Sequence, residues 1–238
     1  GLDAKVSVGS SMNLDLTYNT DFAQVEADEQ QINLDRFSLF FPEKRSFFLE
    51  NAGLFSVGSG GGYFGPDIEM FFSRRIGVGS GGAPVPIIGG GRLTGTLSGM
   101  KLGILSMQTD KVKDVTDGNQ YSVLRLKKEL PNRTHFGGMY TALNHLGENA
   151  YVNKSYALDA QLGIGELSKI IAFAGFTDTP ELNKDKSYAF RLEAARDTKS
   201  ISTVTSYTEV GADFNPEMGY LKRESYRKWS GRIFTRFR

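Results

Sequence analysis

The sequence predicts an all-β fold, organised as one antiparallel meander of long strands. Apolar and polar residues alternate along most segments, which is the period of a strand with two different faces. Most of these segments reach the roughly 9 to 11 residues of a tilted membrane strand, whereas globular strands centre on about 5 or 6. Short turns alternate with longer polar connections, an asymmetry typical of outer-membrane barrels. The predicted fold class is therefore an antiparallel transmembrane β-barrel.

The chain opens with a predicted β-hairpin. Residues 2–8 alternate in polarity, and a short turn leads into a strand with Leu14 and Leu16 on one face and Asp15 on the other. From residue 87 onward, a meander of further strands is separated by turn sequences rich in Gly, Pro, Asn and Ser. These strands are predicted at residues 87–97, 101–110, 120–130, 134–144, 155–165, 169–179, 187–196, 201–210 and 227–237.

Alternation alone does not separate a barrel from a soluble β-sandwich, because one face of a sandwich sheet meets the core and the other meets water. Tyr188, Phe190 and Leu192 share one face of their predicted strand, for example. Arg191 and Glu193 share the other face. Strand length favours the barrel, and a soluble β-sandwich interaction domain stays as an alternative.

Residues 23–66 fit neither a regular strand nor a simple turn. We expect them to form an irregular, plug-like insert, and residues 1–238 to be part of a single outer-membrane β-barrel domain. Within the insert, residues 26–36 have the one plausible helical composition in the chain. Residues 67–76 are predicted as a strand between Gly-rich loops.

Composition excludes several classes of function. The 28 basic and 27 acidic residues give a net charge of +1, so no global attraction to nucleic acid is expected. The chain has no cysteine and two histidines, so it has no disulfide framework, and neither a metal site nor a cofactor is predicted. No apolar run approaches the roughly 18 to 20 residues of a membrane-spanning helix.

No catalytic residue is assigned from the sequence. A GxSxG nucleophile elbow is absent, and the Gly-rich tract at residues 58–62 lacks the lysine of a phosphate-binding loop. The acidic residues Asp21, Glu26, Asp28 and Glu29 do not follow the spacing of an EF-hand. An envelope hydrolase scaffolded on a barrel is kept as an alternative function, with no residue constellation in its favour.

Charged residues beside paired phenylalanines form the candidate site. Burial of an unpaired charge is costly, so charges next to aromatic rings in an irregular segment indicate buried ion pairs. We expect Glu43 or Glu50 to pair with an arginine and the segment 40–55 to fold into or across the barrel as a plug. A structural clasp without a transport role is the alternative. The predicted lumen or plug cluster consists of Glu43, Lys44, Arg45, Glu50, Arg74 and Arg75.

Four sequence blocks carry a resemblance to a known family. They are NTDFAQVEAD at residues 19–28, FFPEKRSFFLENAGLF at 40–55, FFSRRIG at 71–77 and ADFNPEMGYLKRE at 212–224. The chain resembles a family of bacterial outer-membrane β-barrels that is catalogued as a domain of unknown function. Members usually follow an N-terminal carbohydrate-binding module similar to family nine. Ser46 departs from the pattern, which has proline there.

The resemblance implies a location in the bacterial outer membrane, with the lipid bilayer as partner, and no known activity. It leads us to expect a channel or a membrane anchor, linked to carbohydrate binding or uptake through a module outside this sequence. Strand-like patterns run to both ends of the chain, so we expect it to be a fragment of a longer barrel.

Overall fold

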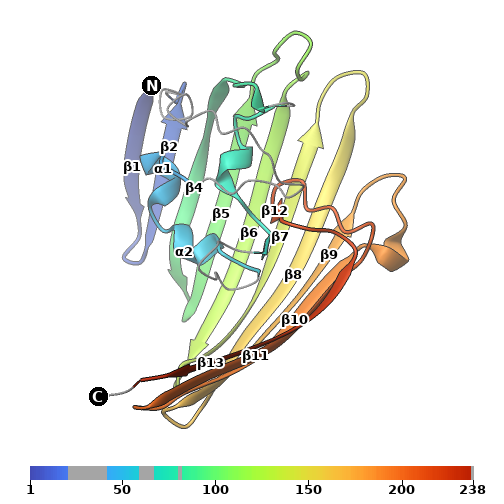
Figure 1. The fold of residues 1–238 in the computed structure, drawn as a ribbon. Coiled ribbons are helices and arrows are strands. Elements are labelled where there is room, and N and C mark those ends of the chain that lie inside the picture. Colours follow the sequence, from blue (N-terminus) through green and yellow to red (C-terminus); the bar gives the residue numbers. More distant parts are fainter. Residues whose placement is uncertain (21–41, 59–66, 80–81, 237–238) are drawn as a thin grey trace.

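The computed structural model describes residues 1–20, 42–58, 67–79 and 82–236. Eleven strands form one antiparallel sheet in which each strand pairs with the next along the chain (Figure 1). The strands of this sheet, in pairing order, are β1 (Leu2–Val8), β2 (Met12–Tyr18), β4 (Ile87–Leu97), β5 (Met100–Thr109), β6 (Asn119–Leu130), β7 (Thr134–His145), β8 (Tyr151–Ile164), β9 (Ser168–Asp178), β10 (Tyr188–Asp197), β11 (Ile201–Val210) and β13 (Tyr226–Thr235).

A few short elements complete the described structure. Two two-residue strands pair with each other, and four short helices lie in connections. They are β3 (Ile68–Glu69), β12 (Tyr220–Leu221), α1 (Ser46–Leu49), α2 (Ala52–Phe55), η1 (Ser73–Arg75) and η3 (Lys184–Lys186). None of the helices in the described residues is long and apolar enough to cross a membrane.

The predicted all-β meander is confirmed. The strands predicted at residues 2–8, 87–97 and 201–210 begin and end where β1, β4 and β11 do. The strand predicted at residues 67–76 is wrong, because β3 ends at Glu69 and η1 follows. This segment pairs with β12 and packs against the face of the large sheet instead of joining it, so its contacts with other segments override its local pattern. The predicted helical stretch at 26–36 lies outside the described residues, and the one-turn helices α1 and α2 were not predicted.

The sheet is open. Strands β1 and β13 each pair on one side only within the described chain, so both are edges and no closed barrel is formed by these residues (Figure 1). An unpaired edge leaves a row of backbone N–H and C=O groups without ladder partners. The structure therefore supports the antiparallel sheet of the predicted barrel, and not its closure.

The connections are strongly asymmetric, as the sequence predicts. Three residues or fewer join β1 to β2, β4 to β5, β6 to β7, β8 to β9 and β10 to β11, all at one end of the sheet. The connections at the other end are longer, and the longest, between β2 and β4, spans residues 19–86. This connection is longer than the insert predicted at residues 23–66, and from here on we call residues 19–86 the insert. Its described parts lie against one face of the sheet (Figure 1).

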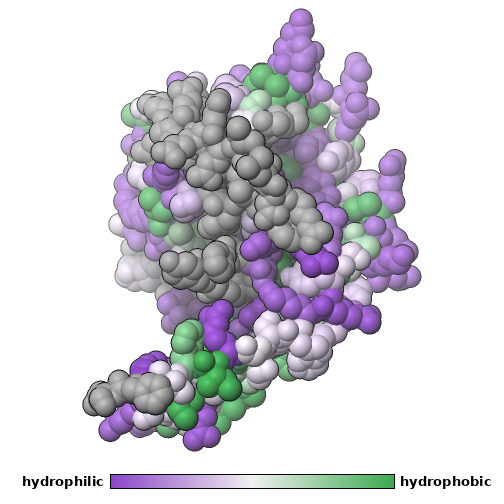
Figure 2. Space-filling model, in the orientation of Figure 1, coloured by the Kyte–Doolittle hydropathy of each residue, from purple (hydrophilic) through white to green (hydrophobic). Residues whose placement is uncertain are grey.

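The two faces of the sheet differ in chemistry. We call the face that carries the insert the inner face and the opposite one the outer face. Asp15, Arg92, Arg125 and Ser155 point to the inner face and are buried there. Most of the neighbours that alternate with them are apolar and point outward, as Leu14, Leu16, Leu93, Leu124 and Leu126 do. Viewed from the insert, hydrophilic residues cover much of the described surface, and hydrophobic residues gather near the C-terminal strand (Figure 2).

A hydrophobic core joins the insert to the inner face. Phe48, Phe55, Ile68 and Phe71 are among its members from the insert. The sheet contributes Ile87, Leu105, Met107, Tyr121, Val123, Met139, Leu143, Ala157, Phe173, Ala189 and Val210, and the loop after β11 contributes Phe214 and Met218. We call the eleven-stranded sheet the wall. Burying a large apolar side chain stabilises a fold by about 1.5–3 kcal/mol, so this core fixes the insert on the wall.

Gly103 of β5 lies directly under this core. A Cβ atom at Gly103 would be 2.8 Å from the Phe55 ring and 3.0 Å from Leu54. The position is therefore fitted to a glycine, because the insert approaches the strand backbone too closely for a side chain.

We predict that Gly103→Ala lowers the free energy of unfolding by about 1–3 kcal/mol, because the added methyl group overpacks the contact with Phe55. Equilibrium unfolding in urea measures the change. Gly231→Ala on β13 is the matched control, since a Cβ atom there meets nothing within 4 Å. Equal stability of the two variants would contradict the close contact between α2 and β5.

Candidate functional site

The predicted charge cluster is divided among three places. Glu43 pairs with Arg45 inside the insert. Glu50 pairs with Lys5 of β1 and with Arg92 of β4, at the inner face. The other two arginines donate to backbone: Arg74 to the Pro42 carbonyl at 3.1 Å, and Arg75 to the Gly219 carbonyl at 3.0 Å. Lys44 follows Glu43, and its backbone N–H donates to the Glu43 carboxylate.

The Glu43–Arg45 pair organises the start of the insert. Arg45 is buried, and its guanidinium donates twice to Glu43, at 2.9 and 2.7 Å. It also donates to the carbonyls of Ile76 and Ser73, at 2.8 Å each, and lies 4.2 Å from the centre of the Phe48 ring. One side chain thereby ties Pro42–Arg45, α1 and η1 into a unit.

Two opposing effects act on the Glu43 carboxyl. Burial alone would raise the pKa of Glu43, because a low-dielectric site disfavours the charged form. Hydrogen bonds from Arg45 and Ser73 outweigh burial and hold the pKa of Glu43 below its usual range. The Glu43 carboxyl is therefore ionised at neutral pH. Burial lowers the pKa of Arg74.

Arg92 of β4 is the first connection between wall and insert. Its guanidinium pairs with Asp15 of β2 at 2.7 Å, directly opposite in register, and with Glu50 at 3.2 Å. The same group donates to the carbonyls of Phe47 and Glu50 at the end of α1. Arg92 is 1% exposed, so these contacts replace its water completely.

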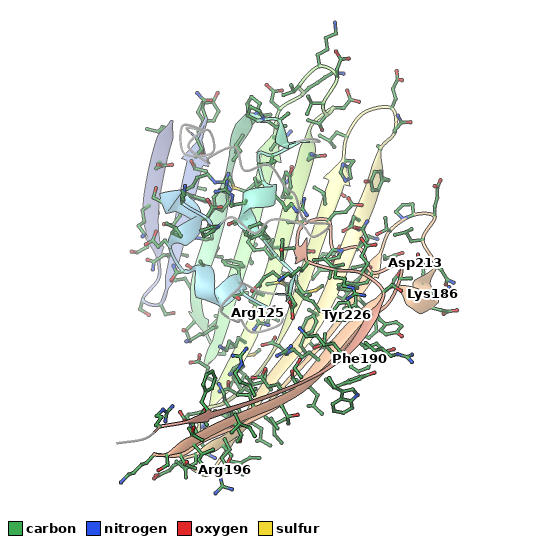
Figure 3. The ribbon with its side chains drawn as sticks, in the orientation of Figure 1. Arg125, Lys186, Phe190, Arg196, Asp213 and Tyr226 are labelled. Atoms are coloured by element: carbon green, nitrogen blue, oxygen red, sulfur yellow. The ribbon has the colours of Figure 1, made fainter. Side chains whose placement is uncertain are left out.

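Arg125 of β6 makes an equivalent connection to α2. It forms a two-fold ion pair with Asp159 of β8, at 2.5 and 2.9 Å, and its Nε donates to the Leu54 carbonyl at 3.1 Å. Figure 3 shows Arg125 on the wall beside α2. To reach Asp159, the guanidinium crosses β7 at Gly137, where a Cβ atom would lie 2.5 Å from it. Glycine at 137 makes the pair sterically feasible.

The two wall arginines satisfy a backbone requirement of the insert. The last carbonyls of a helix have no partner within the helix, and a one-turn helix has little else than such groups. Phe47, Glu50 and Leu54 are at or near the ends of α1 and α2, and their carbonyls accept from Arg92 or Arg125. The wall therefore completes the hydrogen bonding of the insert.

The loop between β11 and β13 also contacts the insert, at β3 and at the segment that follows β3. Its strand β12 pairs with β3, and Arg75 and the Phe72 N–H donate to the carbonyls of Gly219 and Met218. Glu217 anchors the same loop to the rim of the wall. The Glu217 carboxylate contacts His145 Nε2 at 2.8 Å, the Tyr151 hydroxyl at 3.2 Å and the Asn215 amide at 3.0 Å.

A cleft of about 450 Å³ opens beside this anchor, bordered by residues such as Arg75, Tyr121, His145 and Glu217. Its Glu217 carboxylate is already engaged by a histidine, a tyrosine and an amide. Three existing contacts leave this group suited to fixing the loop and poorly suited to taking a proton from a substrate. In the described residues, no three His, Asp or Glu side chains gather as metal ligands.

A second pocket, of about 270 Å³, lies between the insert and the wall. It is bordered mainly by apolar side chains, four of them phenylalanines, and contains Glu69 of β3. Burial raises the pKa of Glu69 to about 7, because the carboxylate receives only a long hydrogen bond from Ser56, at 3.3 Å, and one from the Val57 backbone.

The site predicted from the sequence does not include Arg92, Arg125, Asp159 or Glu69. A signal exists for the first three, since each alternates with apolar residues along a strand and so belongs to the polar face. For Glu69 no such signal exists, because its environment comes from segments distant in sequence.

Comparison with known proteins gives one match. A family model described as a domain of unknown function (DUF5916) matches residues 1–85, which hold β1, β2 and nearly all of the insert. No curated protein and no solved structure matches the chain. The match supports the resemblance to a family of unknown function over these residues, and it provides neither a neighbouring module nor a membrane location.

We predict that Arg125→Met lowers the free energy of unfolding by about 3–5 kcal/mol, because it leaves the Asp159 carboxylate uncompensated at a largely buried site. Denaturant titration measures the loss. Lys101→Met is the control, since its 2.8 Å pair with Glu129 is half exposed and such pairs contribute about 0–1 kcal/mol. Similar losses in the two variants would show that Arg125 is not a structural connection.

Proposed function

We propose that the chain forms part of the wall of a transmembrane β-barrel in the outer membrane of a diderm bacterium, with the insert in its lumen. One observation carries the proposal: the apolar face of the sheet is exposed, and the polar face is covered. A soluble sandwich has the reverse arrangement, because its apolar faces meet each other in the core.

Large apolar side chains are exposed along the outer face. Leu158 of β8 is 65% exposed, and Trp229 of β13 is 78% exposed. Other outward, exposed side chains are Leu2, Val6, Val8, Leu16, Ile104, Leu124, Leu126, Phe136, Leu162, Ile164, Phe176, Leu192 and Ile233. Soluble monomers rarely show continuous apolar surfaces larger than a few hundred Å². A lipid environment accounts for such a surface.

Aromatic side chains form a band across the outer face. Tyr140 and Tyr156 stand 5.3 Å apart on β7 and β8, and Phe176 and Tyr188 continue the same row in register. Ring contacts extend the band from Tyr188 through Phe190 and Tyr207 to β13, where the ring of Trp229 lies 4.6 Å from that of Tyr207. Tyr and Trp concentrate at membrane interfaces, because their rings are apolar and their polar atoms reach water.

Charged residues lie at both ends of this apolar zone. Figure 3 shows Arg196 at the end with short turns and Lys186 and Asp213 at the end with long loops, with Phe190 between them. Strands β4 to β11 and β13 have 10 to 14 residues each, enough to cross the hydrocarbon core at a tilt.

The inner face has the polarity of a lumen. Arg191 pairs with Glu193 at 2.6 Å on β10, and Lys228 of β13 lies 3.5 Å from Asp67 of the insert. A barrel interior tolerates these groups because water or other polar residues fill it. In a closed barrel, the edges at β1 and β13 would also be paired, which removes the unsatisfied backbone groups from lipid.

Within this proposal the insert acts as a plug, and the barrel is a channel or an anchor. The connections through Arg92 and Arg125 favour an insert that is held in place at rest. A link to carbohydrate remains a prediction from the resemblance. Neither the envelope hydrolase nor the soluble sandwich gains support from the geometry.

We predict that Leu158→Arg lowers the free energy of unfolding in lipid vesicles by about 2–4 kcal/mol, because it puts a charge near the bilayer midplane. Leu167→Arg is the control, since Leu167 is 48% exposed in the turn after β8, where the cost is about 0–1 kcal/mol. At an exposed site in water both changes would be nearly neutral. A soluble, detergent-free protein that tolerates Leu158→Arg would contradict the membrane assignment.

We predict that deleting residues 40–55 makes single-channel steps appear or enlarge in planar bilayers, because the lumen loses both α1 and α2. The measurement uses the full-length protein, and a deletion in the loop at residues 111–117 serves as a control at the same end of the barrel. Silence from the wild type and both deletions, with the barrel shown to be folded, would favour the anchor over the channel.

A further inference from the structure

The pocket between the insert and the wall is mainly apolar, and four of its side chains are phenylalanines. Phe48 and Phe55 border it from α1 and α2, and Phe71 and Phe72 border it from the segment after β3. Leu105 of β5 forms part of its floor on the wall. At about 270 Å³ it is slightly smaller than typical sites for drug-sized ligands, so it suits a small molecule.

Glu69 is the one charged group of this pocket without a counter-ion among the described residues. Glu43 also borders the pocket and is neutralised by Arg45, and Arg92 is neutralised by Asp15 and Glu50. Tyr220, which faces Glu69 in register from β12, carries no charge at neutral pH.

An apolar pocket with a single uncompensated carboxylate is complementary to one kind of ligand. The carboxylate attracts a cation, and aromatic rings attract the same cation over their faces while they bury an apolar body. The insert already uses this chemistry internally, because Arg45 lies 4.2 Å from the centre of the Phe48 ring.

We propose that this pocket binds a small organic ammonium ion with an aromatic or alkyl body, and that the Glu69 carboxylate is its counter-ion. A neutral sugar would leave the carboxylate without a counter-ion, and an anion would be repelled by it. The proposal concerns a ligand of the insert and does not depend on the membrane assignment.

The pKa of Glu69 gives the proposal a pH dependence. At a pKa of about 7 the carboxyl is protonated at pH 6 and ionised at pH 8. An alkylammonium group titrates near pH 10 and stays charged throughout this range. The affinity for the ammonium ion should therefore rise as the pH rises through about 7. Below that value the affinity should fall about tenfold for each pH unit.

The test is a ligand-observed NMR titration of the full chain with 2-phenylethylammonium, and with 2-phenylethanol as the neutral match. For the wild type at pH 8 we expect amine binding to saturate as the amine concentration approaches ~10 mM, because a site with a Kd of about 1 mM would then be nearly full. Glu69→Gln should weaken amine binding about tenfold to a hundredfold, the range of a charge-assisted contact, and remove its pH dependence. Binding of the alcohol should be the same in both proteins.

Glu166→Gln is the control variant, because Glu166 is exposed in the turn between β8 and β9, at the far end of the sheet. It should bind the amine as the wild type does. Unfolding curves that match for all three proteins ensure that the pocket is intact. The proposal is overturned if the wild type does not bind the amine, or if Glu69→Gln binds it equally well at pH 8.

Phe55→Leu provides a second, independent measurement. It keeps an apolar side chain in the core and removes one ring from the pocket, so amine binding should weaken several-fold while the pH dependence set by Glu69 remains. Unchanged affinity in this variant would exclude an aromatic contribution to the site.

Discussion

The rest of the structure depends on the hydrogen bonds that arginine side chains of the wall donate to backbone carbonyl groups of the insert. The described part of the insert contains two α-helices of one turn each, which are too short to be stable alone and end in unsatisfied carbonyls. Arg92 and Arg125 supply donors to those carbonyls, and Asp15 and Asp159 neutralise the arginines from neighbouring strands. The wall arginines thus satisfy the carbonyls of the insert, and the insert satisfies hydrogen-bond donors of the buried arginines. Without the insert, these arginines would lose part of their hydrogen bonding.

This arrangement explains why the polar face of the sheet is the covered one. A face that must present arginines, carboxylates and hydroxyls to an irregular segment cannot be an apolar core throughout. The hydrophobic core is instead shared between the insert and the middle of the wall, with the ion pairs around it. The apolar residues displaced to the outer face then need a partner of their own, for which lipid has the right chemistry.

Sequence patterns predicted the strands well, because alternation is a local property of the chain. Strands β1, β4 and β11 were predicted to the residue, whereas β8 begins at Tyr151 and not at residue 155, because its polar start pairs with β7 at His145. Closure of the sheet was not predictable in this way. It depends on pairing between strands at opposite ends of the meander, which no local pattern sets.

The candidate site was predictable in part. Neighbouring residues such as Glu43 and Arg45 pair within the insert, as the sequence suggested. Glu50 has partners on β1 and β4 instead, because the register of β2 on β4 puts Asp15 opposite Arg92 and draws Glu50 to the same guanidinium. The environment of Glu69 arises from helices, a strand and a wall far apart in sequence, so only the folded chain creates it.

The topology also imposes an order on folding. Each wall strand pairs with its neighbour in sequence, so the meander can grow by short loop closures, which are entropically cheap. The insert precedes most of the wall in the chain, yet its contact from Arg75 to Gly219 joins residues that are 144 positions apart. The insert must therefore wait for almost the entire wall before it can dock. Until the insert docks, its aromatic residues are exposed to water and prone to aggregation. The nascent chain therefore has its greatest need of chaperone protection during this period.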